Sequence, residues 1–401
     1  MIDTPVQKSQ AVSDRRPIIF VVAAEPSGDA LGAPILDALS DLAPGRYRYV
    51  GIGGEQMIEA GLEPIFPMAD ITAFGLAEVL PRIPTILRRL KETEQAIRLM
   101  KPSLLLTIDG PDHSFRLAKK LRNLSMPKMH LVAPTVWAWR PKRAAKVAKL
   151  YDHLLCLFPF EPPYFEAEGM AASFIGHPLV TGPAMSADGD EFRQRHGIPS
   201  DQRLITVLPG SRRGEVEKLS GVFGEALGLL RQRIGSFTAV IPTVGPVADL
   251  VRANTEDWPV DHVVVQGIED KYGAMAASKA GLAASGTVAL ELALTGLPGV
   301  IAYRANPISA AIFRRLALTQ YVSLPNIILQ RPLIPECLQE DCTPNRLADE
   351  LEAMCKFEKR RDSVLDGYKQ VAEKLGAGQL DPATMAAKTL LKLAASKPEP
   401  V

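Results

Sequence analysis

Short runs of aliphatic and β-branched residues alternate with longer amphipathic stretches along most of the chain. The runs predict strands at 18–24, 47–51, 103–108, 130–132, 153–158, 204–208, 239–241, 262–266, 280–284 and 299–303. The stretches 30–43, 84–100 and 115–124 carry apolar residues at helical spacing. Strands that alternate with helices form parallel sheets with helices on both faces. The expected fold class is therefore α/β.

The strand–loop–helix pattern begins twice, which predicts two Rossmann-like domains that face each other across a cleft. One start is I-I-F-V-V-A-A-E-P-S-G-D-A-L-G and the other is L-I-T-V-L-P-G-S-R-R-G-E-V. A stretch rich in Pro, Gly and Asp separates the halves. We expect a disordered tail over 1–16, a first domain over 17–178, an interdomain linker over 179–203, a second domain over 204–394 and a disordered tail over 395–401. The site should lie at the carboxyl ends of the strands.

Composition narrows the class of protein further. The chain has 401 residues, 47% of them hydrophobic and 23% charged, which is ordinary for a globular protein of two or three domains and excludes a fibrous or disordered chain. The four cysteines form no C-x-x-C pair and there are six histidines, so we expect neither a disulfide scaffold nor a metal site. No apolar run is long enough for a membrane span, and the polar N-terminus lacks a secretion signal. These features predict a cytoplasmic protein.

The net charge of +1 hides a strong asymmetry. Residues 82–149 contain 16 Lys and Arg against four Asp and Glu, a local excess of +12. Such an excess indicates either an anionic partner, such as phospholipid or a phosphorylated substrate, or simply solvated helix faces. Aromatic residues are too sparse there for stacking on single-stranded nucleic acid, which we do not expect as a partner.

Two strand–helix junctions in the second half can bind phosphate. In L-P-G-S-R-R-G-E-V-E, Gly210 allows a tight turn, Ser211 and the first helical amides are donors, and Arg212 or Arg213 adds positive charge. In A-S-G-T-V-A-L-E, residues 285–287 (Ser285, Gly286 and Thr287) form a second set of donors. Glu291, one turn into that helix, can accept both hydroxyls of a ribose. Together the junctions favour a nucleotide diphosphate, although each alone could be an ordinary capped helix.

The first half offers a candidate base. Asp109 follows an apolar strand in T-I-D-G-P-D-H-S-F and would point into the cleft, where it could deprotonate a substrate hydroxyl. An Asp before Gly is also a common turn former. Glu25, Ser27 and Asp29 close the first strand in E-P-S-G-D and would face the same cleft, with capping of the next helix as the alternative role of Ser27 and Asp29.

An apolar patch rimmed by arginines occupies residues 68–90. Its two prolines argue against one continuous helix. The patch suits an acyl chain or a membrane surface, with core packing as the alternative. Trp137 and Trp139 in T-V-W-A-W-R lie beside a basic helix and suit an interface as well. The residues that we assign to this side of the cleft and to lipid are Glu25, Ser27, Met68, Phe74, Leu76, Val79, Leu80, Arg82, Trp137 and Trp139.

The strings E-P-S-G-D, G-I-G-G-E-Q-M, F-G-L-A-E-V-L, I-D-G-P-D, V-W-A-W-R, F-I-G-H-P, L-P-G-S-R, A-S-G-T-V-A-L-E and Y-V-S-L-P-N occur in this order. Together they resemble the lipid-A-disaccharide synthase family, glycosyltransferases of the two-Rossmann-domain (GT-B) architecture. The resemblance implies an inverting transfer from UDP-2,3-diacylglucosamine to 2,3-diacylglucosamine 1-phosphate. It also implies an enzyme without a cofactor, peripherally bound to the anionic inner-membrane surface.

The resemblance also implies roles for single residues. Asp109 matches the family's base, and Arg212 and Asn326 match positions that handle the diphosphate. The expected donor set is Gly210, Ser211, Gly267, Ser285, Gly286, Thr287, Glu291 and Asn326, with Asp109 and Arg212 as the catalytic pair. Ala24 and His113 depart from the family, which usually has Gly and an aromatic residue there. A UDP-sugar epimerase of similar fold and a non-catalytic membrane-surface protein are the alternatives, and the sequence leaves the oligomeric state open.

Overall fold

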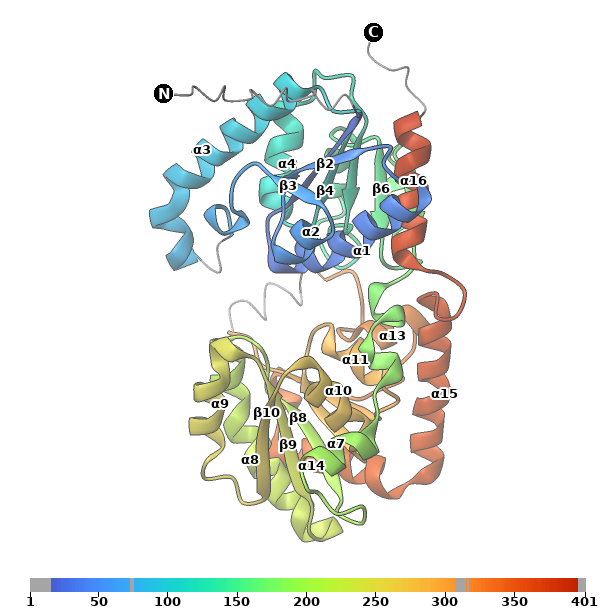
Figure 1. The fold of residues 1–401 in the computed structure, drawn as a ribbon. Coiled ribbons are helices and arrows are strands. Elements are labelled where there is room, and N and C mark those ends of the chain that lie inside the picture. Colours follow the sequence, from blue (N-terminus) through green and yellow to red (C-terminus); the bar gives the residue numbers. More distant parts are fainter. Residues whose placement is uncertain (1–15, 73–75, 307–314, 316, 396–401) are drawn as a thin grey trace, which may run out of the picture.

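The computed structural model describes residues 16–72, 76–306, 315 and 317–395 (Figure 1). Most of the two predicted tails, residues 1–15 and 396–401, therefore lies outside the described residues. Two parallel sheets with helices packed around them form two domains, so the predicted fold class is confirmed.

The first sheet has seven parallel strands in the order β3-β2-β1-β4-β5-β6-β7. Its strands are β1 (Ile18–Ala23), β2 (Arg48–Ile52), β3 (Leu62–Pro64), β4 (Leu104–Ile108), β5 (Lys128–Leu131), β6 (His153–Cys156) and β7 (Ala171–Phe174). The order reverses between β1 and β4, and such a switch point leaves a crevice at the carboxyl ends of the two strands. The short strands β3 and β7 had no sequence signal.

The second sheet has six parallel strands in the order β10-β9-β8-β11-β12-β13, with its switch point between β8 and β11. Its strands are β8 (Leu204–Leu208), β9 (Thr238–Thr243), β10 (Asp261–Gln266), β11 (Ala280–Ala284), β12 (Gly299–Tyr303) and β13 (Glu336–Leu338). Strands β8 and β11 are buried along their whole length because helices cover both faces, which explains their continuous apolar sequences.

The helices fill the connections between the strands (Figure 1). They are α1 (Pro26–Leu42), α2 (Glu55–Glu59), α3 (Leu76–Met100), α4 (Pro111–Lys120), α5 (Arg143–Ala148), α6 (Pro162–Glu166), α7 (Gly189–Arg195), α8 (Arg213–Ile234), α9 (Ala248–Thr255), α10 (Ile268–Ala277), α11 (Val288–Leu294), α13 (Leu324–Leu329), α14 (Pro344–Lys356), α15 (Glu358–Lys374) and α16 (Pro382–Ala395). Within the described part of the chain, no helix is both long and apolar enough to cross a bilayer.

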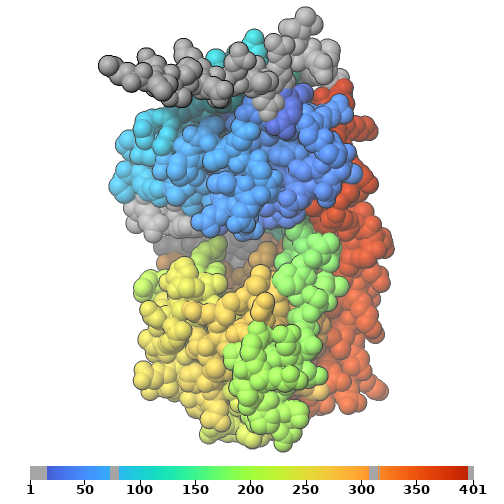
Figure 2. All heavy atoms as spheres, viewed as in Figure 1, coloured from blue at the N-terminus to red at the C-terminus, as the bar shows by residue number. Residues whose placement is uncertain are grey.

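The last helix belongs to the first domain, not to the second as the assignment of 204–394 implied. Helix α16 packs on α1 and β4, and its Ala386, Ala387 and Leu390 are buried in the core of the first domain (Figure 1). Figure 2 shows the C-terminal part of the chain, in red, running beside both halves of the molecule. The chain therefore passes between the domains twice. The two passages touch where the His177 N–H donates to the Leu375 carbonyl (3.0 Å).

The stretch expected to be a linker is folded. Its short 3-10 helices η2 (Pro178–Thr181) and η3 (Pro183–Ser186) pack on the second domain, where Val180 and Ala184 are buried. Phe192 of α7 is fully buried in a second small cluster of that domain. The Pro- and Gly-rich stretch is therefore the start of the second domain and not a linker. Its buried apolar residues are too widely spaced along the sequence to show a periodicity.

Helix α3 contains both prolines of residues 68–90, so the expected interruption is wrong. Pro81 and Pro84 lie three residues apart, which places them on one side of the helix, and both are exposed. Water can bind backbone carbonyls that lose their amide donor on that side, and a helix can bend at such positions. In Figure 1 this helix runs along the outer side of the first domain, where it packs against α4 and η1 (Met68–Asp70).

Candidate active site

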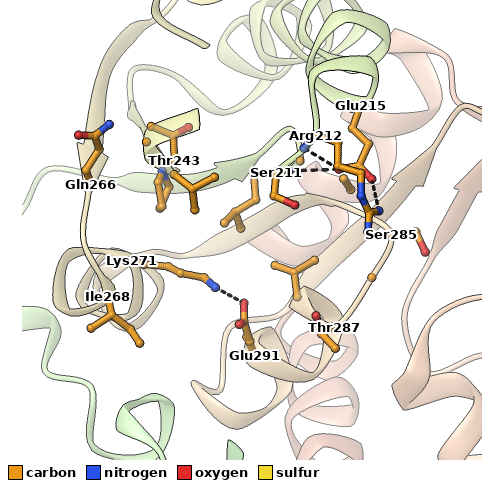
Figure 3. Close-up of a pocket in the computed structure, with 18 of the residues that line it drawn as sticks. Ser211, Arg212, Glu215, Thr243, Gln266, Ile268, Lys271, Ser285, Thr287 and Glu291 are labelled. Atoms are coloured by element: carbon orange, nitrogen blue, oxygen red, sulfur yellow. Dashed lines mark hydrogen bonds and ion pairs between the residues drawn. The ribbon is translucent and has the colours of Figure 1, made fainter. Parts of the chain in front are cut away.

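A cavity of about 650 Å³ lies in the second domain at the carboxyl ends of β8, β9, β10 and β11 (Figure 3). Seven of the eight residues expected to bind the donor line it, and so does Arg212. The lining residues predicted from the sequence are Gly210, Ser211, Arg212, Gly267, Ser285, Gly286, Thr287 and Glu291. They come from loops that follow three different strands, which the parallel sheet brings to one edge.

The loop after β8 is held by Glu215. One of its carboxylate oxygens accepts the N–H groups of Ser211 (3.1 Å) and Arg212 (3.3 Å), and the other accepts the Arg212 guanidinium (3.1 Å; Figure 3). Gly210 has φ +122°, and a Cβ there would lie 2.5 Å from the Glu215 side chain. Glu215 therefore takes two of the amides that we expected to be available to phosphate.

Glu291 lies near the start of α11 and is almost buried. One oxygen pairs with the Lys271 ammonium at 2.6 Å (Figure 3), and the other accepts the Tyr272 hydroxyl at 3.2 Å. Burial and the neighbouring Glu291 raise the pKa of the Tyr272 hydroxyl, so Tyr272 remains a neutral donor. Each carboxylate oxygen has a second lone pair, so Glu291 can still accept a bond from a ligand.

Several lining residues had no motif in the sequence, among them Lys271, Thr243, Gln266 and Ile268. Lys271 supplies a cation, and the buried Thr243 hydroxyl has no hydrogen-bond partner among the described residues. Gln266 and the exposed Ile268 flank Gly267 at the end of β10. For Gln266, Ile268 and Lys271 the available signal was the strand–glycine–helix junction of residues 262–277. The two phosphate-binding loops that we did predict lie at junctions of the same kind.

In the first domain, the switch point between β1 and β4 brings Asp109 to Glu25 and Ser27. The Ser27 hydroxyl donates to an Asp109 carboxylate oxygen at 3.0 Å. Burial and the carboxylates of Asp109 and Asp112 raise the pKa of Glu25. The structure therefore brings two carboxyl groups and a hydroxyl together, and all three belong to residues that the sequence analysis assigned to the cleft.

Asp29 is not part of this group, which corrects the expectation that it faces the cleft. It is buried, and its oxygens accept the N–H groups of Gly54 (2.7 Å), Met57 (3.1 Å) and Gln56 (3.2 Å). These bonds satisfy donors at the start of α2, which have no partners within the helix. Asp29 therefore fixes α2 against α1.

The carboxyl edges of the two sheets face each other (Figure 1). Phe158 and Phe160, which follow β6, pack against the core of the second domain. The Leu318 N–H of the second domain donates to the carbonyl of Ala138, in the loop after β5 (3.0 Å). The group formed by Glu25, Ser27 and Asp109 lies on the side of the first domain that faces the second domain. The cavity lies on the side of the second domain that faces the first.

Asn326 does not line the cavity. It is buried, and its amide nitrogen donates to the Ile334 carbonyl (3.0 Å) and to Glu336 (2.8 Å). Its oxygen accepts the N–H groups of Leu333 (2.9 Å) and Ile334 (3.0 Å). All four hydrogen-bonding sites are used inside the protein. In this structure Asn326 holds the turn after α13, which corrects its assignment to the donor set.

The residues expected on the lipid side include Met68, Arg82 and residues at the start of α3. Met68 is partly buried beside the first domain's core, and the Arg82 guanidinium donates to the carbonyls of Thr72 (2.6 Å) and Ala69. Phe74 lies outside the described residues, and Leu76, Val79 and Leu80 lie in the first turns of α3.

The two tryptophans have different environments. Trp137 is buried, contacts the Phe160 ring edge-on, and donates its ring N–H to Glu161 (3.2 Å). It is therefore part of the core and not of a lipid surface. Trp139 is partly exposed, and the Arg140 guanidinium lies 4.0 Å from its ring centre.

Comparison with known proteins identifies the family. The family model LpxB, lipid-A-disaccharide synthetase, matches residues 19–390. The lipid-A-disaccharide synthase of Rhodospirillum centenum is 50% identical over 378 residues, 94% of each chain. That of Paramagnetospirillum magneticum is 44% identical over 93% of this chain and 97% of its own. A putative UDP-N-acetylglucosamine 2-epimerase from Listeria monocytogenes shares the fold alone (TM-score 0.63, 14% identity, 94% and 95% coverage). This chain therefore belongs to the lipid-A-disaccharide synthetase family of glycosyltransferases.

Proposed function

We propose that this chain transfers a diacylated glucosamine from UDP to the 6-hydroxyl of a second diacylglucosamine that carries a 1-phosphate. The products are a β-1,6-linked disaccharide 1-phosphate and UDP. The observation that carries this assignment is the pair of facing switch-point sites. In the first site the Asp109 carboxylate accepts a hydrogen bond from Ser27. The second site is a cavity lined by Arg212, Lys271 and the loop of residues 285–287.

In this mechanism Asp109 accepts the proton of the acceptor 6-hydroxyl while that oxygen attacks the anomeric carbon. The bond from the anomeric carbon to the UDP oxygen breaks on the opposite side, and the configuration inverts. Negative charge then grows on the diphosphate, where Arg212 and the donors at 285–287 stabilise it. A retaining enzyme would need a carboxylate nucleophile at the anomeric carbon, a role that this proposal does not require.

The first test is a reconstituted reaction. Purified protein is incubated with both lipid substrates, and UDP and the disaccharide are quantified. We expect one UDP per disaccharide, and we expect no UDP when the acceptor is left out. An epimerase would instead convert lipid-free UDP-N-acetylglucosamine into its 2-epimer. Such conversion without disaccharide formation would replace our proposal with the epimerase alternative.

Glu291 should contribute more to nucleotide binding than to chemistry. Glu291→Gln removes the charge while retaining the side-chain length, so it weakens a charge-assisted bond to the ribose and the ion pair that orders Lys271. We expect the UDP Kd to rise about tenfold, the equivalent of about 1.4 kcal/mol, with kcat nearly unchanged at saturating donor.

Calorimetric titration of UDP measures this effect. Glu269→Gln is the matched control, because Glu269 is an exposed carboxylate on the neighbouring α10 that pairs with Arg195 (3.0 Å). An unaltered UDP Kd in Glu291→Gln would remove Glu291 from the ribose site.

The lipid substrates place the reaction at a membrane surface, and we propose α3 as the contact. Ile83 and Leu87 lie one turn apart on this helix and are 39% and 49% exposed. Arg88 adds exposed positive charge beside them. Apolar side chains next to cations suit the surface of an anionic bilayer, where each basic residue contributes about 1 kcal/mol. Binding should be peripheral and reversible.

Ile83→Ser/Leu87→Ser should therefore weaken binding to vesicles of anionic phospholipid about thirtyfold in a co-sedimentation assay, because two apolar contacts worth about 1 kcal/mol each are lost. The UDP Kd should not change. Leu42→Ser/Ile58→Ser is the matched control, since these residues are 42% and 44% exposed on α1 and α2 and not on α3. Binding should also weaken as salt rises from 0.1 M to 1 M, where the Debye length falls to about 3 Å. Equal sedimentation of the two double variants would argue against this surface.

A further inference from the structure

Asp109 has an unusual backbone. Its φ is +50°, in the left-handed region, and Gly110 follows with the same φ. This conformation costs an L-residue such as aspartate about 1–2 kcal/mol, and it persists only where the surroundings hold it. It also turns the chain sharply at the end of β4, which directs the Asp109 carboxylate toward Ser27. The groups that hold this turn therefore set the position of the carboxylate.

Two backbone groups of Asp109 are anchored. Its N–H donates to the Leu131 carbonyl of the neighbouring strand (3.0 Å), and its carbonyl accepts the Ser114 hydroxyl (2.7 Å). The Ser114 N–H also donates to the Gly110 carbonyl (3.0 Å). Ser114 is buried in the first turns of α4, so it ties both left-handed residues to that helix.

Ser114 is in turn bonded to a buried network. Its carbonyl accepts the Tyr151 hydroxyl at 2.9 Å, and the Tyr151 oxygen accepts the Thr107 hydroxyl at 3.0 Å. The Thr107 oxygen lies 2.7 Å from His130 Nδ1. The His130 and Tyr151 rings stack with centres 5.0 Å apart, and the Phe115 ring packs edge-on against both. Strands β4 and β5, helix α4 and the segment between α5 and β6 thus meet at the turn that holds Asp109.

Each proton in this chain has one consistent place. A carbonyl can only accept, so Tyr151 must donate to Ser114 and use its oxygen as acceptor for Thr107. The Thr107 hydroxyl also lies 3.4 Å from the Met129 carbonyl, but its donation to Tyr151 accounts for the shorter contact of 3.0 Å. With the Thr107 proton in that bond, the tautomer that satisfies the contact at His130 carries its hydrogen on Nδ1 and donates to Thr107. Burial lowers the pKa of His130 to about 3, which keeps the ring neutral at physiological pH. The direction of the chain is therefore His130, Thr107, Tyr151, Ser114, with the Ser114 hydroxyl ending on the Asp109 carbonyl.

We propose that Ser114 and Tyr151, supported by Thr107 and His130, are positioning residues that hold the left-handed turn and so aim the Asp109 carboxylate. This inference rests on the proposed role of Asp109 as the base. In this proposal none of the four residues touches the substrate. A misplacement of a reacting group by about 1 Å can cost about a hundredfold in rate, so the loss of one bond in the chain should be visible in kcat.

The test is a double-mutant cycle. Ser114→Ala and Tyr151→Phe are each made in the wild-type protein and in Asp109→Asn. In the wild type we expect kcat to fall about tenfold while the UDP Kd stays the same. In the Asp109→Asn background we expect no further fall, because the carboxylate that the chain aims is already absent. Tyr368→Phe controls for the loss of a buried tyrosine hydroxyl, since Tyr368 lies in the core of the second domain.

General destabilisation would give a different pattern, because a smaller folded fraction lowers activity by the same factor in both backgrounds. Additive losses would therefore overturn the positioning role, and so would full activity of both Ser114→Ala and Tyr151→Phe. A fully active Asp109→Asn would instead overturn the proposed base. The two failures are thus distinguishable in one set of measurements.

Discussion

Asp109→Asn should lower kcat by about two to four orders of magnitude, the usual loss when a general base is removed. Asparagine has the shape of aspartate and keeps an oxygen that can accept a hydrogen bond from Ser27. In the wild-type structure the Ser27 hydroxyl lies 3.0 Å from the Asp109 carboxylate. It cannot accept the proton of the acceptor 6-hydroxyl. The fold should be unaffected, because the Asp109 side chain lies at the end of a strand and is partly exposed. Single-turnover assays with both lipid substrates measure the effect.

The controls separate chemistry from binding and folding. The thermal midpoint and the UDP Kd of Asp109→Asn should match the wild type. Asp112→Asn is the matched variant, since Asp112 is an exposed carboxylate three residues away in the first turn of α4. It should retain most activity. If Asp109→Asn turns over at nearly the wild-type rate, another group is the base, and Glu25 would be the next candidate because it shares the site.

Arg212→Ala should lower kcat about a hundredfold, the effect expected when a donor that stabilises developing charge is removed. Arg212 lines the cavity, and its side chain is 82% exposed. Its partner Glu215 forms an exposed ion pair, which is worth less than about 1 kcal/mol, so the guanidinium can turn to a diphosphate at small cost. The contact gains strength as charge moves onto the leaving UDP, so kcat should fall more than UDP affinity.

Arg213→Ala is a close control for this variant. Arg213 is 72% exposed, pairs with Glu217 at 3.2 Å, and does not line the cavity. Each variant loses one exposed ion pair near the start of α8, so their stabilities should agree within about 1 kcal/mol. Steady-state rates at saturating donor give the comparison. Equal defects would mean that both arginines act on the diphosphate or that Arg212 has no special role.

The predictable part of this protein is what lies close together along the chain. Apolar runs of three to seven residues with helical stretches between them identify ten of the thirteen strands in the described structure. Loops such as Leu208–Arg212 and Ala284–Thr287 follow directly from those strands, so their place at one sheet edge follows from the parallel topology. The same argument brings Asp109 to Ser27, since β1 and β4 are neighbours. Short strands such as β13 have too few residues for a periodicity to appear.

Tertiary structure decides the remainder, because the partner of a buried polar group can come from any part of the chain. Asn326 and Asp29 carry the residue types of a binding site, yet the side-chain oxygens of both accept backbone N–H groups that would otherwise be buried without a partner. Helix α16 has an apolar face, and packing against α1 and β4 places it on the first domain. The chain from His130 to Asp109 joins residues up to 44 positions apart, and no local pattern encodes it. Local sequence thus determines which residues have side chains suited to chemistry. Burial and long-range hydrogen bonds determine which of those side chains remain available to a ligand.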